Sequence, residues 1–300
     1  MITCMPERNE MRVLLVGASG RVGGMVLHHW RENDALGFSI VRQDRRDVPP
    51  CGLQWSPLDG VGTLVDHVRR SGPINAMVVL AGVTSGPGKD LDLNSALALA
   101  CVAAAQQAQI GRVLLSSSSA VYGAGKGIPL TEAAPTEPVN AYGKAKCAME
   151  LAVAPWRDRG RDRGLDLCCL RIGNVAGADA LLLNVARLSP QEPVIIDRFA
   201  DGQGPIRSYI GAGTLAAVLR TLATQAASLP PVLNIGAPAP VSMEALAHAA
   251  GQPYRFRHAP SQARQHITLD CAALARLHPF TTDDSDPHAM VAQWRDAVSV

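Results

Sequence analysis

The chain has 300 residues, of which 47% are hydrophobic and 18% are charged, so it can bury a sizeable core and lacks the composition of a disordered protein. This length fits one large domain, with or without a smaller lobe. The net charge of +2 at pH 7 is too small to indicate nucleic acid as a partner. The sequence contains no run of eighteen apolar residues, so it predicts no membrane span. The N-terminal MITCMPERNEM lacks the pattern of a signal peptide. We therefore expect neither nucleic acid nor a membrane among the partners.

The cysteines and histidines indicate neither a disulfide framework nor a metal site. The seven cysteines are scattered without a CxxC pair, which is typical of free thiols in a reducing cytoplasm, where we expect this protein. The histidines show no metal-ligand spacing, and we interpret His28 and His29, which lie within a predicted helix, as structural. The sequence therefore predicts no metal.

Strand and helix patterns alternate through the first 175 residues. Continuous apolar runs, typical of strands buried on both faces, occur at Arg12–Val16, Ser39–Arg42, Asn75–Leu80, Arg112–Ser116 and Leu165–Arg171. Helical spacing of apolar residues between them predicts helices at Val22–Arg31, Gly62–Arg70, Asn94–Gln109 and Ala141–Val153. This alternation predicts the α/β class, with a Rossmann-type, doubly wound parallel sheet.

The composition changes after residue 175, where prolines separate short elements and helices are predicted at 211–228 and 242–250. We divide the chain into a sheet-forming domain, residues 1–175, and a smaller α/β substrate-binding lobe, residues 176–300, some elements of which return to the sheet. The long loop Gly123–Asn140 is rich in glycine and proline and is a candidate lid.

A glycine motif, Gly17-Ala-Ser-Gly20-Arg-Val-Gly23, joins the first predicted strand to the first predicted helix. Gly17 permits a tight turn, Gly20 lets the backbone approach a pyrophosphate, and Gly23 lets the helix pack closely on the strand. The free N–H groups of the helix N-terminus would face the phosphates. A glycine triplet alone also fits a simple tight turn, but this placement favours dinucleotide binding. The predicted cofactor contacts here are Gly17, Ser19, Gly20, Arg21, Val22 and Gly23.

Asp44 follows the second predicted strand, about 20 residues beyond Gly23, where an acidic residue can hydrogen-bond the ribose 2′-OH of NAD. The neighbouring Arg42, Arg45 and Arg46 could instead accept the 2′-phosphate of NADP, although they also fit an ordinary solvated loop. We expect NAD as the cofactor and leave NADP open.

Tyr142 and Lys146 open a predicted helix, and Ser116–Ser119 precede them at the end of a strand. A tyrosine hydroxyl has a pKa of about 10 and is a poor acid or base at neutral pH. A lysine one helical turn away would lower that pKa, and a serine hydroxyl could hydrogen-bond the reacting oxygen. The YxxxK spacing alone also fits a surface helix pair. Its combination with the glycine loop and the serine-rich strand end indicates redox chemistry.

These motifs resemble those of the extended short-chain dehydrogenases/reductases, in the NAD-dependent epimerase/dehydratase family that includes UDP-glucose 4-epimerases. The similarity covers nearly the whole chain, through GASGRVG (17–23), LLSSSSAVYG (114–123), YGKAK (142–146), LRIGNVAG (170–177) and DGQGPIRSYI (201–210). The SSSSAVYG and YGKAK pair is its most specific part, and the resemblance implies that residues 1–175 bind NAD(P).

The resemblance also assigns roles to single residues. It implies that Tyr142 transfers the proton, that Lys146 holds the nicotinamide ribose, and that Ser118 contacts the reacting oxygen. Further implied cofactor contacts are Asp44, Arg45, Leu58, Leu80, Ala81, Gly82 and Ser116. Implied substrate contacts are Thr84, Ser118, Asn174, Arg207 and Arg264, of which the two arginines would grip a diphosphate and also fit ordinary surface pairs.

The resemblance implies an NAD(P)-dependent enzyme that acts on a nucleoside-diphosphate sugar, as a 4-epimerase or a 4-keto reductase. Two alternatives are a dehydrogenase of a free sugar or sugar acid and a non-catalytic dinucleotide-sensing protein. Related 4,6-dehydratases carry a carboxylate just after the serine, where this chain has Ser119 and Ala120, and related 3,5-epimerases carry a cysteine at the Ala120 position, so the resemblance implies neither activity. A homodimer is implied through the helices at 94–109 and 141–155.

Overall fold

The computed structural model describes residues 11–33, 37–46, 52–125, 127–160 and 164–299. The segment on which the signal-peptide prediction rests, residues 1–10, lies outside the described residues.

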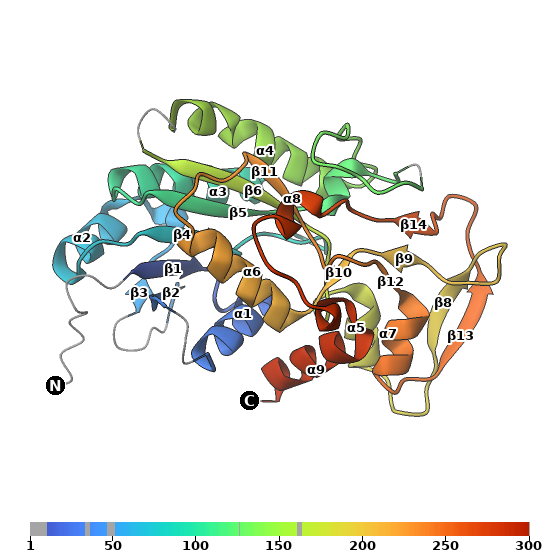
Figure 1. The fold of residues 1–300 in the computed structure, drawn as a ribbon. Coiled ribbons are helices and arrows are strands. Elements are labelled where there is room, and N and C mark those ends of the chain that lie inside the picture. The colour runs from blue at the N-terminus through green and yellow to red at the C-terminus, as the bar shows by residue number, and fades with distance from the viewer. Residues whose placement is uncertain (1–10, 34–36, 47–51, 126, 161–163, 300) are drawn as a thin grey trace.

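A seven-stranded sheet forms the centre of the molecule (Figure 1). Its strand order is β3-β2-β1-β4-β5-β6-β11, and every neighbouring pair is parallel. The strands are β1 (Arg12–Val16), β2 (Ser39–Asp44), β3 (Leu53–Gln54), β4 (Ala76–Val79), β5 (Arg112–Ser118), β6 (Asp166–Ile172) and β11 (Val232–Ile235). The order reverses next to β1, which is the doubly wound arrangement that the sequence predicts.

Helices cover both faces of the sheet, and the alternating side chains of β1 show how. Leu14 and Val16 pack into the core formed with α2 (Gly62–Ser71), α3 (Leu93–Gln107) and α4 (Ala141–Gly160). Val13 and Leu15 pack on the other side, in the core formed with α1 (Arg21–Arg31), α6 (Ala212–Thr224) and α9 (Pro287–Val298). Because both faces are buried, the strands carry continuous apolar runs.

The C-terminal third forms smaller elements beside the carboxyl end of the sheet (Figure 1). Short sheets pair β7 with β10, β8 with β13, and β9 with both β12 and β14. These elements are β7 (Asn174–Val175), α5 (Ala180–Val185), β8 (Val194–Arg198), β9 (Ile206–Arg207), β10 (Tyr209–Ile210), β12 (Val241–Ser242), α7 (Met243–Ala249), β13 (Tyr254–His258), β14 (His266–Ile267) and α8 (Ala272–Ala275). Strand β11, which lies beyond residue 175, joins the main sheet beside β6. The division of the chain into two parts at residue 175 stays a prediction.

Helix α4 is longer than the helix predicted at Ala141–Val153. It continues to Gly160 and contains Pro155. A proline removes one helical hydrogen bond, which leaves the carbonyl of Leu151 without its usual partner. Leu151 is 73% exposed, so water can satisfy that carbonyl. The Arg159 side chain also donates to the Pro155 carbonyl at 2.9 Å, which supports the last turn.

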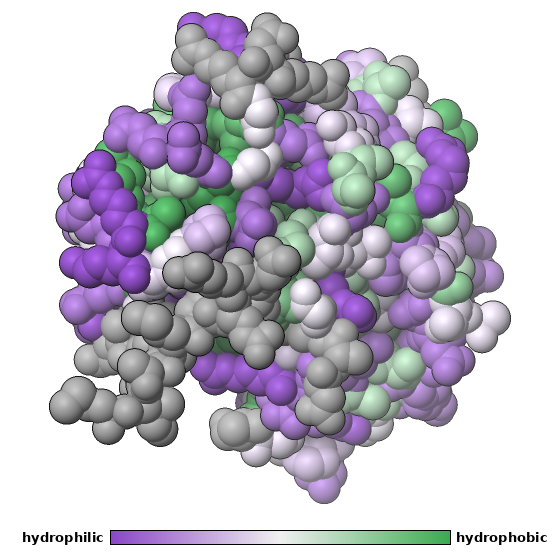
Figure 2. All heavy atoms as spheres, turned by 60° about the vertical axis from the view of Figure 1, so that its left-hand side comes forward, coloured by the Kyte–Doolittle hydropathy of each residue, from purple (hydrophilic) through white to green (hydrophobic). Residues whose placement is uncertain are grey.

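The surface mixes polar and apolar residues. Figure 2 shows hydrophilic side chains spread over one face, with smaller apolar groups between them. Within the described ranges, no helix is both long enough and apolar enough to cross a membrane.

Candidate active site

The glycine loop lies between β1 and α1 and leaves its backbone open to a ligand. Gly17 has a φ of +89°, and a Cβ at this position would collide with the backbone of Ala81. A Cβ at Gly23 would collide with the carbonyl of Gly17, so both positions require glycine. Ser19, Gly20 and Arg21 are exposed where α1 begins, as a pyrophosphate site needs. The residues present therefore fit a dinucleotide.

Asp44 is the last residue of β2. This strand pairs with β1, which leads into the glycine loop. The Asp44 carboxylate accepts from Arg42 at 2.9 Å and from the Arg45 amide at 2.7 Å. Burial acts to raise the pKa of Asp44, but the hydrogen bonds from the Arg42 side chain and from the Arg45 and Arg46 amides outweigh it, so the pKa is lowered and the carboxylate stays ionised. Arg42 is thus engaged with Asp44, while the side chains of Arg45 and Arg46 are exposed.

Gln43, which the sequence analysis missed, braces the glycine loop. Its side-chain oxygen accepts from the Gly17 amide at 3.0 Å, and its amide group donates to the Trp55 carbonyl. Gln43 is buried and therefore needs these partners, but between Arg42 and Asp44 in the sequence it gave no signal of its burial. The predicted adenine contact, Leu58, lies nearby on the short 3-10 helix Pro57–Asp59 with 48% of its side chain exposed.

The chain after β4 forms the floor of the predicted cofactor site. The amides of Leu80 and Ala81 both donate to the Val16 carbonyl, at 2.8 and 3.1 Å. A Cβ at Gly82 would lie 3.0 Å from the Asn94 side chain and 3.3 Å from Lys146 Nζ, so this passage is narrow. Asn94 is buried and fixes the next turn, because it accepts from the Val83 amide and donates to the Val83 carbonyl.

Ser118, Tyr142 and Lys146 lie together where β5 and α4 meet. Ser118 Oγ accepts from the Ala120 amide at 3.2 Å, and Lys146 Nζ donates to the Ser116 carbonyl at 2.8 Å. Lys146 Nζ lies 5.9 Å from the centre of the Tyr142 ring. All three line one cavity of about 300 Å³, together with the predicted contacts Val22, Leu80, Gly82, Thr84, Ser116 and Asn174.

The predicted lowering of the Tyr142 pKa by Lys146 is not what this structure shows. Burial raises the pKa of Tyr142, and a hydrogen bond with Ser118 opposes that rise only in part. Lys146 Nζ lies over the Tyr142 ring, 5.9 Å from its centre, and donates to the Ser116 carbonyl. Burial also lowers the pKa of Lys146 to about 8, so it stays mostly protonated at pH 7 and loses its charge as the pH rises through 8.

A buried ionic network that the sequence analysis did not identify lies directly behind these residues. Glu150 and Arg171 are buried and joined at 2.7 Å, and Ser117 donates to the Glu150 carboxylate. The Arg171 guanidinium also stacks on Tyr122, with 4.7 Å to the ring centre, and Tyr122 donates to Asn234. The network therefore connects β5, α4, β6 and β11 behind the reactive side chains.

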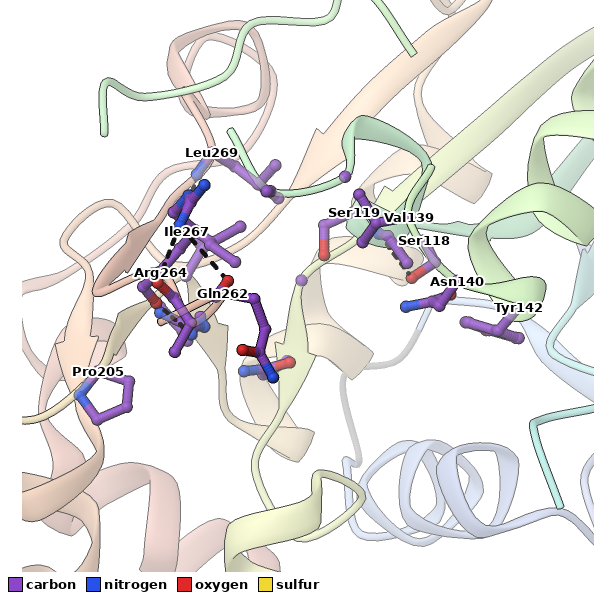
Figure 3. A pocket seen from close by; sticks show the side chains of 18 of the residues that line it. Ser118, Ser119, Val139, Asn140, Tyr142, Pro205, Gln262, Arg264, Ile267 and Leu269 are labelled. Carbon is purple, nitrogen blue, oxygen red and sulfur yellow. Dashed lines mark hydrogen bonds between the residues drawn. The ribbon is translucent and has the colours of Figure 1, made fainter. Parts of the chain in front are cut away.

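A second cavity of about 520 Å³ adjoins the first, and Ser118, Tyr142, Gly173 and Asn174 line both. In Figure 3, Ser118, Asn140 and Tyr142 stand on one side of it, and Gln262 and Arg264 on the other.

Arg207 also lines this second cavity and is held by main-chain carbonyls. It donates to Ile206, Gln265 and Arg264 at 2.6–2.9 Å. The guanidinium is thus fixed in position without a carboxylate among these partners. Arg264 lines the same cavity, but its side chain is exposed and donates to Ala263, so it is less firmly held.

The candidate lid, Gly123–Asn140, is fastened at its middle. The Leu130 amide donates to Thr268, and the Leu130 carbonyl accepts from Asp270 and Asn234. Glu132 accepts from the Asn234 amide at 3.0 Å. These bonds tie the middle of the loop to β11 and to Thr268 and Asp270, and its role as a lid stays a prediction.

Similarity to known proteins covers the part of the chain that contains this site. The model of the NAD-dependent epimerase/dehydratase family matches residues 13–236, which include the glycine loop, Ser118, Tyr142, Lys146 and Arg207. The chain belongs to this family. Membership confirms the resemblance and the Rossmann-type fold.

Relatives of this epimerase/dehydratase chain include a UDP-glucose 4-epimerase of Azospirillum brasilense, which is 36% identical over 177 residues. That match covers 56% of this chain and 50% of the relative, so the similarity spans about half the length of the curated relatives it matches. A solved structure of MoeE5 in complex with UDP-glucuronic acid and NAD has a TM-score of 0.75 at 24% identity, covering 95% of this chain and 98% of that one. A Thermus thermophilus UDP-glucose 4-epimerase complex with NAD gives 0.72 at 21% identity, covering 96% and 100%. These structures share the fold.

Proposed function

We propose that this protein is an NAD-dependent enzyme that acts at C4 of a nucleoside-diphosphate sugar, as a 4-epimerase or a 4-keto reductase, with NADP as the alternative cofactor. The observation that carries the proposal is the meeting of two cavities at Ser118, Tyr142 and Asn174. One cavity continues toward the glycine-loop side of the sheet, and the other is lined by Arg207. A cofactor and a sugar held in them would meet at the tyrosine.

The chain's own residues would move one proton. NAD, when bound, accepts a hydride from the sugar and can return it. Tyr142 would exchange a proton with the C4 oxygen, and Ser118, which hydrogen-bonds the tyrosine, would donate to that same oxygen. Lys146, held by the Ser116 carbonyl, would bind the ribose. Asp44, Arg45, Leu58 and the glycine loop would hold the rest of the cofactor. Holding the sugar within reach matters as much as the proton transfer.

The position of Arg207 favours a substrate that carries a diphosphate over a free sugar. The Arg207 guanidinium lines the second cavity and is fixed by three carbonyls, so none of these three partners is a carboxylate. A positioned guanidinium is well suited to phosphate oxygens. Asn174, Thr84 and Arg264 are further proposed substrate contacts. The structures similar to this chain include complexes of related proteins with UDP-glucuronic acid and with UDP-glucose.

We also propose that residues 1–175 bind the cofactor, that residues 176–300 bind the substrate, and that two chains pair through α3 and α4. The exposed Leu151 on α4, at 73%, and the small alanine side chains of α3 support close packing between two copies. A cytoplasmic location stays a prediction.

The test is conversion of UDP-sugars by the full chain. We expect UDP-glucose and UDP-galactose to interconvert with NAD present, or their 4-keto forms to be reduced with NADH present, and free glucose and galactose to be inert. Tyr142→Phe should lower turnover by at least ~10²-fold with cofactor binding retained. Tyr254→Phe, which changes an exposed tyrosine on β13, is the matched control and should leave turnover unchanged. Net NAD reduction by free sugars, or full activity of Tyr142→Phe, would contradict the proposal.

A further inference from the structure

Helices α1 and α9 bring together three side chains with metal-binding atoms from opposite ends of the chain (Figure 1). His28 Nε2 lies 2.8 Å from Asp296 Oδ2, and His29 Nδ1 lies 3.7 Å from the same oxygen. One candidate ligand atom of each residue lies within 4.8 Å of the other two. The imidazoles are 15% and 14% exposed, whereas the carboxylate is 62% exposed and opens to water.

The surroundings of His29 fix its orientation. Its Nε2 lies 3.1 Å from the main-chain oxygen of Gln293 on α9. A carbonyl can only accept, so Nε2 carries a proton, and Nδ1 is the ring nitrogen directed toward Asp296. Nδ1 and Asp296 Oδ2 lie 3.7 Å apart, which is longer than a hydrogen bond.

A cation between these atoms could bond to both. Zinc binds imidazole nitrogen at about 2.0–2.1 Å and carboxylate oxygen at about 2.0–2.2 Å, so ligand atoms of a tetrahedral site lie roughly 3.4 Å apart. The observed distances of 2.8 and 3.7 Å lie on either side of this value, and the shorter one is a hydrogen bond between His28 and Asp296 that the metal would replace. Asp296 is exposed enough to make the small adjustment. A backbone carbonyl behind a histidine is also the usual support of a metal-bound imidazole.

We propose that His28, His29 and Asp296 bind Zn²⁺, or a divalent transition metal of similar preference, with the remaining positions filled by water. Two imidazoles and one carboxylate favour such a metal over Mg²⁺ or Ca²⁺, which prefer oxygen ligands. The metal would fasten α1, the helix that starts at the glycine loop, to the C-terminal helix. This proposal replaces the sequence-based prediction of no metal, and it is independent of the sugar chemistry. The neighbouring Arg295 is turned away, because it donates to Ala250 at 2.6 Å.

The experiment is titration of Zn²⁺ into the full chain, without an affinity tag and freed of metal by a chelator, with heat as the readout. We expect one ion per chain, affinity lowered at least ~10-fold in both His29→Gln and Asp296→Asn, and no binding of Mg²⁺. The matched control is His288→Gln, which removes an exposed histidine of α9 that meets His248 edge to face and belongs to no such cluster among the described residues. This variant should bind Zn²⁺ as the parent does.

Circular dichroism of each variant separates lost binding from lost folding. Asp296 is exposed, so Asp296→Asn remains decisive even if His29→Gln fails to fold. The proposal is overturned if the parent protein shows no saturable Zn²⁺ binding, or if Asp296→Asn binds as tightly as the parent. Weakened binding in His288→Gln alone would place the ion elsewhere and would overturn it as well.

Discussion

Replacing Glu150 by glutamine tests whether the buried ionic network supports the candidate active site. The Glu150 carboxylate accepts from Arg171 Nη2 at 2.7 Å and from Arg171 Nε at 3.1 Å, and Ser117 donates to it as well. The two charged side chains are 10% and 8% exposed. Glutamine has nearly the same shape but no charge, so the variant leaves the Arg171 guanidinium buried without a counter-charge.

The expected loss of stability follows from that burial. Breaking a buried ion pair by removing one partner costs about 3–5 kcal/mol. The entropy of unfolding is about 2.1 cal/mol/K per residue, so a 300-residue chain should lose roughly 5–8 °C in its unfolding midpoint. Differential scanning calorimetry at pH 7 measures this shift. Glu32→Gln, at the exposed end of α1, is the control and should change the free energy of unfolding by less than about 0.5 kcal/mol.

The double variant Glu150→Gln with Arg171→Gln makes the test specific to the pair. Removing both charges leaves no uncompensated charge, so the double variant should be less destabilised than the sum of the two single variants. If Glu150→Gln melts within about 1 °C of the parent protein, or if the two effects simply add, the pair is not coupled and the reasoning is refuted.

Three further variants test the assigned roles. Asp44→Ala should weaken NAD more than NADP, as measured by calorimetric titration, because the 2′-OH loses its acceptor while Arg45 and Arg46 remain; a parent protein that prefers NADP would contradict this. Arg207→Ala should raise KM for a nucleoside-diphosphate sugar about tenfold or more and spare kcat, whereas an unchanged KM would favour the free-sugar alternative. Burial lowers the pKa of Lys146 from its ordinary 10.5 to about 8 in the folded chain, so between these pH values the unfolded chain binds one more proton. The free energy of unfolding should therefore rise from pH 8 to 10.5 by up to ~3 kcal/mol more in the parent than in Lys146→Met, and parallel urea-unfolding profiles would contradict the burial of this charge.

The fold could be predicted because its determinants are local in sequence. The apolar runs of β1 and β6 and the glycines at 17 and 23 act within single elements or between adjacent ones. Tyr142 and Lys146 are one helical turn apart, so their proximity also follows from sequence. The end of α4 was missed, because an exposed proline can remain within a helix when water satisfies the freed carbonyl.

The ionic network and the proposed metal site could not be predicted, because their members come from distant elements. Glu150 and Arg171 meet only when α4 covers β6, although each carried a signal as a charged residue in an apolar surrounding. His28 and Asp296 are 268 residues apart, so no spacing rule relates them. The direction of the Tyr142 pKa also depends on burial, which a spacing pattern does not contain.

The lining of the two cavities limits the chemistry that the site can perform. Loss of water across C5 and C6 of a 4-keto sugar needs a base for the C5 proton and an acid for the leaving hydroxyl, beyond the proton that Tyr142 carries. Among the described residues that line the cavities, the carboxylates are Asp179 and Asp197. Asp179 caps α5 by accepting from two of its amides, and Asp197 accepts from Arg257 at 2.7 Å.

The loop carboxylates that could have supplied this chemistry are placed elsewhere. Glu132 accepts from the Asn234 amide, and neither Glu132 nor Glu137 lines the described cavities. Ser119 and Ala120 cannot replace them, so the proposed chemistry stays hydride transfer with one tyrosine proton. Incubation with NAD and UDP-sugars in deuterated water should give no 4-keto-6-deoxy product and no deuterium at C5, as judged by NMR and mass spectrometry. Either observation would show that a carboxylate reaches the sugar after all, and that the site performs elimination.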